Sequence, residues 1–481
     1  MPVYYCTADE VREAERATGD LLTSGTLMAR AAHGVARAVL GELTRTGGTY
    51  GRSVGLVIGA GNNGGDALYA GAELRRRGVA VSAVLLAPEQ THAAGLAALT
   101  RAGGRIADEL PVGLDVVVDG VVGIGGRGPL RPAAAAAFAA LSPHTTVVAV
   151  DLPSGVDADT GAVGEPAVRA DVTVTFGVRR RAHLLAAEQC GRVDLVDIGL
   201  GAAGDRTVAA LTDAEVAAHW PVPGPHDDKY TQGVVGIVAG SPRYPGAAVL
   251  CTGGAIAATS GMTRFVGAAA PQVVAHRPEV VATEEFDDAG RVQAWVVGPG
   301  LGTDAQAEAR VERVLADEVP VLVDADGLTV LARRPDLLTG RAAPVLLTPH
   351  AGEFARLAGH PVGPDRLAAT RALAADLGVT VLLKGRITLV ADPQGRVYGN
   401  DAGSSWAATA GAGDVLSGIA GALLAAGRSP LWAGAAAARV HARAARLASG
   451  GAPIGASDLL EAVPSALRGW GELGQMGAEQ R

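Results

Sequence analysis

The chain has 481 residues, of which 48% are hydrophobic and 19% are charged, so we expect a globular protein of two or three domains and exclude a disordered one. The formal net charge is −8, which argues against a nucleic acid or an anionic membrane as a partner, because basic patches recognise such surfaces. Cys6, Cys190 and Cys251 are far apart, the N-terminal residues have no apolar signal core, and no apolar run reaches about 18 residues, so we expect a cytoplasmic protein without disulfides, zinc or a membrane span.

In the first half of the chain, buried strands alternate with glycine turns and helices. Thr7 and Glu10 have the spacing of a capping box and predict a helix that begins after Thr7. Residues 53–60 read as a buried strand, a glycine-rich turn follows, and residues 66–77 are amphipathic. Further buried strands are predicted at 79–86, 115–119 and 146–150. This alternation is typical of a parallel sheet covered by helices and predicts an α/β, Rossmann-like three-layer domain.

The pattern breaks near residue 212 and then restarts. Thr212 and Glu215 predict a short capped helix, and the proline-rich segment 221–225 is typical of a linker. Strands are then predicted from Gly233 onward and at 294–297, 319–323, 345–347 and 379–383, and a long Ala/Leu-rich helix follows Asp414. We therefore predict a first domain at 1–211, a linker at 212–228 and a second α/β domain at 229–481.

Arginine carries almost all of the positive charge. Lys and Arg together number 41, but only Lys229 and Lys384 are lysines. An ammonium group is compact, whereas a guanidinium is broad and planar. The two lysines are therefore candidates for positions that need a compact cation, with chance survival as the alternative interpretation.

Three strand ends in the first half combine glycine with polar oxygens. Segment 59–66 (GAGNNGGD) joins a strand to a helix, Asp119 precedes the glycine-rich segment 123–129, and Asp151 precedes Ser154. Helix N-termini attract anions, and ligands of open α/β sheets bind at the carboxyl ends of the strands. Oxygens at these three places also suit a hard cation. Each aspartate alone is equally compatible with a capping role, but the three together favour one shared pocket.

These segments resemble the NAD(P)H-hydrate epimerase family over about the first 210 residues. The resemblance implies that Asp151 handles protons at the reacting ring and that potassium is bound by Asn63, Asp119 and Ser154. The substrate-binding residues that it implies are Asn62, Asn63, Gly64, Gly65, Asp66, Gly123, Ile124, Gly125, Gly126, Arg127, Gly128, Pro129 and Asp151.

The second half contains one strong glycine motif and several supporting ones. Segment 411–414 (GAGD) opens the long helix, where backbone amides would form an anion hole and the aspartate would accept a proton during phosphoryl transfer. An ordinary glycine-rich helix start explains this motif alone equally well. Segments 298–302 (GPGLG), 324–327 (DADG) and 348–353 (TPHAGE), together with Lys384, lie at further strand ends and favour a binding site.

Together these motifs resemble the ADP-dependent NAD(P)H-hydrate dehydratase family, which has a ribokinase-like fold, over about residues 226–470. The resemblance implies contacts to the hydrated cofactor at Ala247, Gly302, His350 and Asp414, with Asp414 as the catalytic base. It implies nucleotide contacts at Lys384, Gly385, Arg386, Ile387, Thr388, Gly411, Ala412 and Gly413. It also implies ADP with Mg²⁺, although the sequence alone does not separate ADP from ATP.

The two resemblances together imply repair of hydrated NADH and NADPH. Phosphorylation of the ring hydroxyl would create a good leaving group, so that elimination restores the reduced nicotinamide and leaves AMP and phosphate. The dehydratase family acts on the S epimer and the epimerase family interconverts R and S, so a fused chain would clear both. Related proteins often assemble, and we expect a homo-oligomer.

Two alternatives remain open from the sequence. A ribokinase-type kinase would release a stable phosphorylated product instead of free phosphate and reduced nicotinamide. The first domain could instead be a non-catalytic binding module, in which case Asp151→Asn would leave R/S exchange unchanged. The motif at 348–353 and the three oxygen-bearing strand ends of the first domain favour the repair enzyme.

Overall fold

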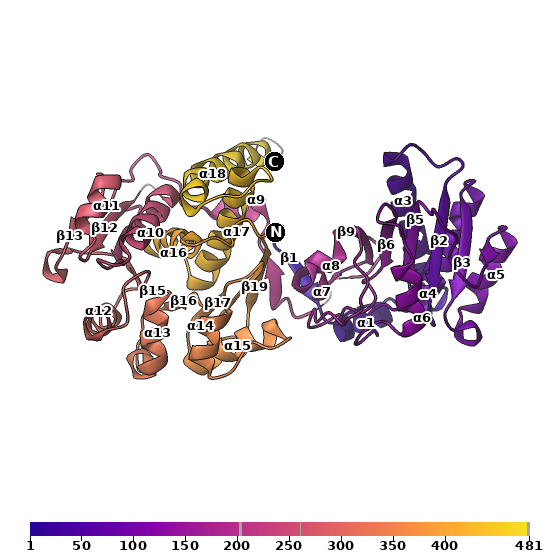
Figure 1. Ribbon diagram of the computed structural model, residues 1–481, viewed down its shortest axis with the longest axis horizontal. Helices are drawn as coiled ribbons and strands as arrows, with labels where there is room; N and C mark the ends of the chain where they lie inside the picture. The colour runs from indigo at the N-terminus through magenta and orange to yellow at the C-terminus, as the bar shows by residue number, and fades with distance from the viewer. Residues whose placement is uncertain (202–203, 260, 479–481) are drawn as a thin grey trace. The chain divides into compact units, whose positions relative to one another are not determined.

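The computed structural model describes residues 1–201, 204–259 and 261–478. The chain forms two compact units, one of Tyr4–Arg206 and the other of Met1–Val3 with Thr207–Arg481. Each unit contains a sheet flanked by helices (Figure 1). Among the described residues, none of the helices combines the length and the apolar character that a membrane crossing requires.

The first unit is built on a sheet of seven strands in the order β4-β3-β2-β5-β6-β7-β9. All neighbouring pairs are parallel, as the alternation of strands and helices predicts. The strands of the sheet are β2 (Ser53–Ile58), β3 (Ala80–Leu85), β4 (Arg105–Ile106), β5 (Val116–Gly120), β6 (Thr146–Val150), β7 (Val172–Phe176) and β9 (Arg192–Val196). Two short strands, β1 (Val3–Cys6) and β8 (Arg179–Arg180), are not part of this sheet. The helices are α1 (Ala8–Ala17), α2 (Asp20–Thr23), α3 (Thr26–Arg45), α4 (Asn62–Arg76), α5 (Ala93–Arg101), α6 (Pro132–Ala139), α7 (Ala182–Leu185) and α8 (Ala187–Cys190).

The two faces of this sheet contact different helices. Leu56 and Ile58 of β2 belong to the core that includes α3 and α4. Val57 of the same strand packs with Val117 beside Phe138 of α6. Successive side chains of a strand point to opposite faces, so β2 is buried on both sides. The predicted three-layer arrangement is confirmed.

The second unit has a larger sheet in the order β13-β12-β11-β14-β15-β16-β17-β18-β19-β10. Strand β18 is antiparallel to both neighbours, and the remaining pairs are parallel. The strands are β10 (Val208–Ala210), β11 (Val234–Val238), β12 (Met262–Val266), β13 (Val281–Thr283), β14 (Ala294–Val297), β15 (Val321–Val323), β16 (Val345–Leu347), β17 (Thr380–Leu383), β18 (Ile387–Ala391) and β19 (Val397–Asp401). The helices are α9 (Asp213–His219), α10 (Pro245–Ala258), α11 (Ala270–His276), α12 (Ala305–Leu315), α13 (Asp326–Arg333), α14 (Ala351–Ala358), α15 (Arg366–Leu377), α16 (Ala412–Ala425), α17 (Pro430–Ser449) and α18 (Ala456–Ala478).

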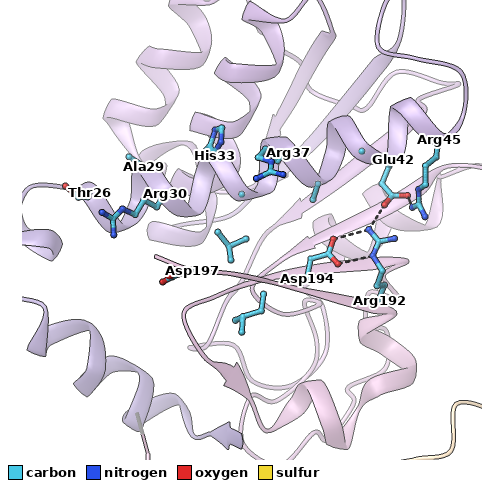
Figure 2. Close-up of a pocket in the computed structure, with 15 residues that line it drawn as sticks. Thr26, Ala29, Arg30, His33, Arg37, Glu42, Arg45, Arg192, Asp194 and Asp197 are labelled. Carbon is cyan, nitrogen blue, oxygen red and sulfur yellow. Dashed lines mark hydrogen bonds and ion pairs between the residues drawn. The ribbon is translucent and has the colours of Figure 1, made fainter. Parts of the chain in front are cut away.

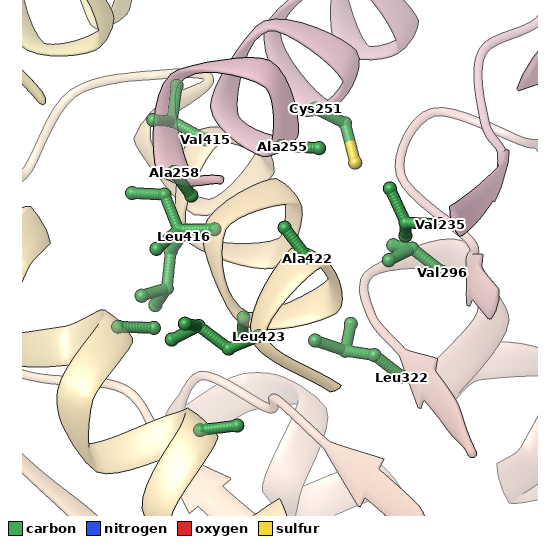
Figure 3. Close-up of a cluster of buried hydrophobic side chains, with 14 of the residues drawn as sticks. Val235, Cys251, Ala255, Ala258, Val296, Leu322, Val415, Leu416, Ala422 and Leu423 are labelled. Atoms are coloured by element: carbon green, nitrogen blue, oxygen red, sulfur yellow. The ribbon is translucent and has the colours of Figure 1, made fainter. Parts of the chain in front are cut away.

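Small side chains let helix α16 lie close to this sheet. Figure 3 shows Leu423 of α16 in the cluster that includes Val296 and Leu322 of the strands. A methyl group at Gly421 would lie only 2.1 Å from Val296 Cγ2. Protein interiors are close-packed, so the glycine determines how near the helix approaches.

Helices α10 and α16 touch through backbone atoms. A Cβ at Gly254 would lie 2.4 Å from the carbonyl oxygen of Val415, and a Cβ at Gly418 would lie 2.0 Å from that of Cys251. Only glycine fits at such distances. Because α16 begins at Ala412, this contact positions the helix that carries the GAGD motif.

The boundary between the units lies earlier than predicted. It falls between Arg206 and Thr207, so the predicted linker at 212–228 and the predicted domain end at 211 need correction. Strand β10 pairs with β19, and Asp213 of α9 forms ion pairs with Arg439 and Arg443 at 2.6 and 3.0 Å. The helix capped by Thr212 is confirmed, but its sequence gave no sign that it packs on the second unit.

Candidate active sites

Helix α4 begins before the predicted start at residue 66. Its first residue is Asn62, and Gly61 occupies the N-cap position. Glycine has low helix propensity, which concealed the first turn of NNGGD in the sequence. Asn62 and Asn63 therefore lie where free backbone N–H groups attract anions, and Asp66 lies beyond the first turn and is not a cap.

A cavity of about 780 Å³ lies at the carboxyl ends of β2, β5 and β6. It brings together the three motifs predicted for the first domain. The predicted substrate residues that line it are Asn62, Asn63, Asp66, Gly123, Ile124, Gly125, Gly126, Arg127, Gly128, Pro129 and Asp151. Gly64 and Gly65 are buried instead. A Cβ on Gly64 would lie 2.6 Å from the Gly59 carbonyl oxygen, and a Cβ on Gly65 would lie 2.9 Å from the His92 ring.

Asp151 is held in an unusual backbone conformation by a buried network. Its φ is 69°, in the left-handed region that non-glycine residues rarely adopt and that recurs at functional sites. Its Oδ1 forms an ion pair with Arg180 Nη2 at 2.9 Å and accepts a hydrogen bond from Thr175 Oγ1 at 3.0 Å. His183 Nδ1 accepts the Arg180 backbone N–H at 3.0 Å. The imidazole proton is therefore on Nε2, which donates to the Asp151 carbonyl oxygen at 2.8 Å.

His183 is a neutral support for this network. Burial lowers the pKa of His183 to about 4, so at neutral pH it carries one proton and no charge. The sequence analysis missed Thr175, Arg180 and His183. The available signal was the polar run that directly follows the strand ending at Phe176.

Asp119 and Ser154 form a second buried group beside the cavity. The Ser154 N–H donates to Asp119 Oδ2 at 2.8 Å, and its hydroxyl donates to Oδ1 at 2.7 Å. Burial raises the pKa of Asp119 to about 6 despite these hydrogen bonds. Asn63 Nδ2 is also buried and has no hydrogen-bond partner. An amide, a single carboxylate and a hydroxyl supply the oxygen donors that a hard cation prefers.

Gly123 connects the three motifs. A Cβ on this residue would lie 2.9 Å from Asn63 Oδ1 and 3.5 Å from Asp151 Oδ2. The first and third motifs therefore meet at the loop that belongs to the second.

A larger groove of about 1090 Å³ lies between α3 and β9 (Figure 2). Its residue Arg192 is paired with Glu42 at 2.8 Å and with Asp194 at 2.9 Å. None of the predicted site residues lines it. The smaller cavity is therefore the candidate active site of the first unit.

In the second unit, the candidate site is organised around Lys384. Its ammonium lies 2.7 Å from Asp324 Oδ1 and 3.6 Å from Glu353 Oε2. Asp324 Oδ2 accepts a hydrogen bond from Ser417 Oγ of α16 at 2.8 Å. Burial acts to lower the pKa of Lys384, but the two carboxylates outweigh it and raise this pKa above its ordinary value. Lys384 is therefore a half-buried group that is charged at neutral pH.

The GAGD turn lies directly beside this cation. Gly411 has a φ of 87°, which glycine adopts readily, and a Cβ on Gly413 would lie 3.6 Å from Lys384 Nζ. Burial, and secondarily the carboxylate of Asp324, raise the pKa of Asp414 to about 7. A carboxyl group with this pKa can accept a proton at neutral pH.

His441 of α17 supports the same turn. Its Nε2 hydrogen-bonds the Ala412 carbonyl oxygen at 2.8 Å, and burial lowers the pKa of His441 to about 4. The ring is therefore neutral and Nε2 is the donor. The sequence analysis did not find His441, because a single histidine in an alanine-rich helix gives no signal of its own.

The residues predicted to contact the hydrated cofactor occupy the neighbouring strand ends. A Cβ on Gly300 would lie 2.7 Å from the Ala247 side chain, which joins Ala247 to the GPGLG turn. The Gly302 N–H donates to Asp326 Oδ2 at 2.8 Å. His350 caps α14, and its Nδ1 accepts the Gly352 N–H at 2.9 Å. The His350 ring is exposed, and its Nε2 lies 3.4 Å from Glu353 Oε1.

The predicted nucleotide segment is the connection between β17 and β18. Thr388 Oγ1 donates to the Gly385 carbonyl at 3.1 Å, and Arg386 pairs with Asp401 at 3.4 Å. Arg366 of α15 supports this turn, because its guanidinium donates to the carbonyl oxygens of Lys384 and Ile387 at 3.2 and 3.4 Å. Lys229, in contrast, is exposed, and its ammonium lies over the Tyr230 ring at 5.3 Å.

Each unit thus carries its own site at the carboxyl ends of its strands. The first has a cavity around Asp151 that both carboxyl and guanidinium groups line, and the second has a proton acceptor and a half-buried cation at a helix N-terminus. This arrangement defines a two-centre α/β enzyme.

Comparison with known proteins agrees with this division. Residues 235–464 match the family model of NAD(P)H-hydrate dehydratase, and residues 24–182 match that of the YjeF-related protein N-terminus. The bifunctional NAD(P)H-hydrate repair enzyme Nnr of Mycobacterium leprae is 57% identical over 97% of this chain and 99% of its own length. The chain therefore belongs to the family of bifunctional NAD(P)H-hydrate repair enzymes.

Two solved structures resemble the second unit. The ADP/ATP-dependent NAD(P)H-hydrate dehydratase of Bacillus subtilis, co-crystallised with ATP and Mg²⁺, is 29% identical, with a TM-score of 0.50, and the match covers 54% of this chain and 98% of that chain. A ribokinase-like superfamily protein of Enterococcus faecalis is 24% identical, with a TM-score of 0.50 over 56% of this chain and 99% of its own. The predicted ribokinase-like fold is confirmed.

Proposed function

We propose that the first unit interconverts the R and S hydrates of NADH and NADPH, and that the second unit dehydrates the S form with ADP. The products of the second reaction would be NADH or NADPH, AMP and phosphate. The observation that carries the proposal is the position of Asp414, which has a pKa raised to about 7 by burial and lies at the N-terminus of α16 beside the Lys384–Asp324 pair.

In the dehydratase, Asp414 would take the proton of the ring hydroxyl. The hydroxyl oxygen would attack the terminal phosphorus of ADP, and AMP would leave. The free amides of the turn at 411–413 and the Lys384 ammonium would stabilise the negative charge that develops on the transferred phosphoryl group. Mg²⁺, when bound with the nucleotide, supplies further charge neutralisation.

Elimination then follows from the altered leaving group. The carbon–oxygen bond breaks, and phosphate leaves with the electron pair. The ring nitrogen supplies electrons to the carbon, and loss of a proton from the adjacent carbon restores the double bond of the dihydronicotinamide. The residues of this site that we assign to the hydrated substrate are Ala247, Gly302, His350 and Asp414, and those that we assign to the nucleotide are Gly411, Ala412, Gly413 and 384–388.

In the epimerase, Asp151 would handle a proton at the reacting ring. The first turn of α4 and the loop at 123–129 would bind the substrate, since both line the cavity. We assign potassium to Asn63, Asp119 and Ser154, where it would place a positive charge beside the buried Asp119 carboxylate. The oxygen donors that these three residues supply support that assignment.

We further propose that the protein acts as a homo-oligomer in the cytoplasm. Cys6, Cys190 and Cys251 are buried free thiols, which suits a reducing compartment. Light scattering of the purified chain at several concentrations would test the oligomeric state.

The decisive experiment follows NADH absorbance after mixing the protein with R and S NADH hydrates, ADP and Mg²⁺. Complete, ADP-dependent recovery would support both activities. Recovery that stops when the S form is spent would contradict the epimerase assignment. A stable phosphorylated product without NADH would instead identify a ribokinase-type kinase.

A further inference from the structure

A third carboxyl group, that of Glu15, lines the epimerase cavity together with Asp151 and Arg180. Glu15 lies on α1, near its C-terminal end. The Glu15 carboxyl is partly buried, and it has no hydrogen-bond or ion-pair partner within the described part of the chain. A polar group placed in a cavity without a partner is available to a ligand.

Helix α1 is fixed relative to the cavity at two points. The Ala8 N–H donates to Asp159 Oδ1 at 2.7 Å. Arg12 Nη2 donates to the Ile124 carbonyl oxygen at 3.4 Å, which ties the helix to the predicted substrate-binding loop. The position of Glu15 therefore follows from anchored secondary structure and not from a free terminus.

The charges around Glu15 come from three elements. Burial raises the pKa of Glu15, the Asp151 carboxylate acts in the same direction, and Arg180 and Arg12 act against them. Asp66 of α4 lines the same cavity. Burial raises the pKa of Asp66, and the charges of Asp151 and Glu15 act in the same direction. Asp151 differs from Glu15 in that two donors, Arg180 and Thr175, hold its Oδ1.

The chemistry of epimerisation calls for two proton-transfer groups. Water adds to the enamine double bond of a dihydronicotinamide so that the hydroxyl is attached to the carbon next to the ring nitrogen. The carbon is inverted when the carbon–oxygen bond breaks and a new one forms on the opposite face. An acid must protonate the departing hydroxyl, and a base must accept a proton from the incoming water.

We infer that Glu15 is the catalytic acid of this epimerisation and Asp151 its base, an inference that rests on the proposed epimerase function. Glu15 donates its proton to the hydroxyl oxygen, which leaves as water with the bonding electron pair. The ring nitrogen shares its lone pair with the planar carbon. Water then attacks from the other face, and Asp151 accepts its proton. Glu15 ends ionised and Asp151 protonated, so the reverse epimerisation uses the same two groups with exchanged roles.

The test measures exchange of purified R NADH hydrate to S without ADP, by chromatography of the epimers. Glu15→Gln is compared with Glu13→Gln, which changes an exposed residue of the same helix. We expect Glu15→Gln to lower kcat by about 10² to 10⁴-fold with KM unchanged, and Glu13→Gln to match the wild type. The wild-type rate should fall as pH rises through the Glu15 pKa, because the acid must be protonated, and Glu15→Gln should lose this dependence.

Thermal unfolding of the same preparations reports whether the first unit is folded, because dehydration of S NADH hydrate reports only on the second unit. If Glu15→Gln yields little folded protein, Glu15→Asp provides the test, since it retains the carboxyl but withdraws it from the cavity, and a fall in kcat at constant KM is again expected. An unchanged kcat, or a loss confined to KM, would overturn the role of Glu15 while leaving the epimerase in place. Absence of R/S exchange in the wild type would instead overturn the epimerase function itself.

Discussion

The Lys384 ammonium lies 2.7 Å from a carboxylate oxygen of Asp324, and the other oxygen of that carboxylate accepts the Ser417 hydroxyl at 2.8 Å. One buried aspartate thus links the end of β17 to helix α16. Of the two lysines in the chain, only Lys384 occupies a place where a compact ammonium is needed, because Lys229 is exposed. A guanidinium is broad and planar, so it would not reproduce the compact contact that the ammonium makes with Asp324.

Replacing Lys384 with Met should destabilise the second unit and weaken ADP binding. The change leaves Asp324 as a buried charge without its cation, which costs about 3–5 kcal/mol. Chemical denaturation measures the stability, and calorimetry with ADP measures the affinity. Lys229→Met is the matched control and should leave both unchanged. Equal stability of Lys384→Met and wild type would contradict the role of this ion pair.

The dehydratase should lose activity as the pH falls below about 7. Burial raises the pKa of Asp414 to about 7, and a general base acts only when ionised, so kcat/KM should fall about tenfold for each pH unit below that value. Asp414→Asn should abolish turnover at every pH. Stopped-flow NADH absorbance between pH 5 and 9 provides the profile, and a rate that rises toward acid pH would exclude Asp414 as the base.

Gly123→Ala should impair the epimerase and spare the dehydratase. The new methyl group would lie 2.9 Å from Asn63 Oδ1, so it must displace the Asn63 amide, and it would contact Asp151 Oδ2 at 3.5 Å. We expect a loss of at least about tenfold in R/S exchange, equivalent to about 1.4 kcal/mol. Gly125→Ala in the same loop is the comparison, because its Cβ meets no closer atom than Arg12 at 4.0 Å. Similar losses in both variants would point to the loop as a whole.

Removing potassium should slow the epimerase. With tetramethylammonium as the only monovalent cation, R/S exchange should fall, and added potassium should restore it. Asp119→Asn should abolish this response, and it should also lower stability by about 1–3 kcal/mol because a buried donor of Ser154 loses its acceptor. Equal exchange rates in the two salts would contradict the potassium assignment.

The sequence predicted the regular parts of the fold well. Strands at 146–150, 294–297 and 345–347 coincide with β6, β14 and β16, because buried parallel strands are short apolar runs. The capping box at Thr7 and the cap residue Thr212 also predicted real helix starts, at Ala8 and Asp213. Such features depend on local composition, which the sequence displays directly.

The failures have a different physical origin. The start of α4 was placed too late because the low helix propensity of glycine conceals the first turn of that helix. The linker was misplaced because the pairing of β10 with β19 joins residues far apart in the chain. Arg180, His183 and His441 support the sites from behind through hydrogen bonds to backbone groups. Only the folded geometry brings such partners together, so the polar run after Phe176 marks a polar region but not the contacts that Arg180 and His183 make in it.

The backbone contacts of Gly254 and Gly418 between α10 and α16 have a consequence for how the second site tolerates change. Core side chains can repack around a substitution, but two main chains that are already in contact cannot move closer together. The backbone contact with α10 therefore fixes the position of the amides in the turn at 411–413. Conservative substitutions of the surrounding alanines and leucines should lower the melting temperature before they change the affinity for the nucleotide. The stability of this unit and its affinity for the nucleotide can therefore change independently in evolution.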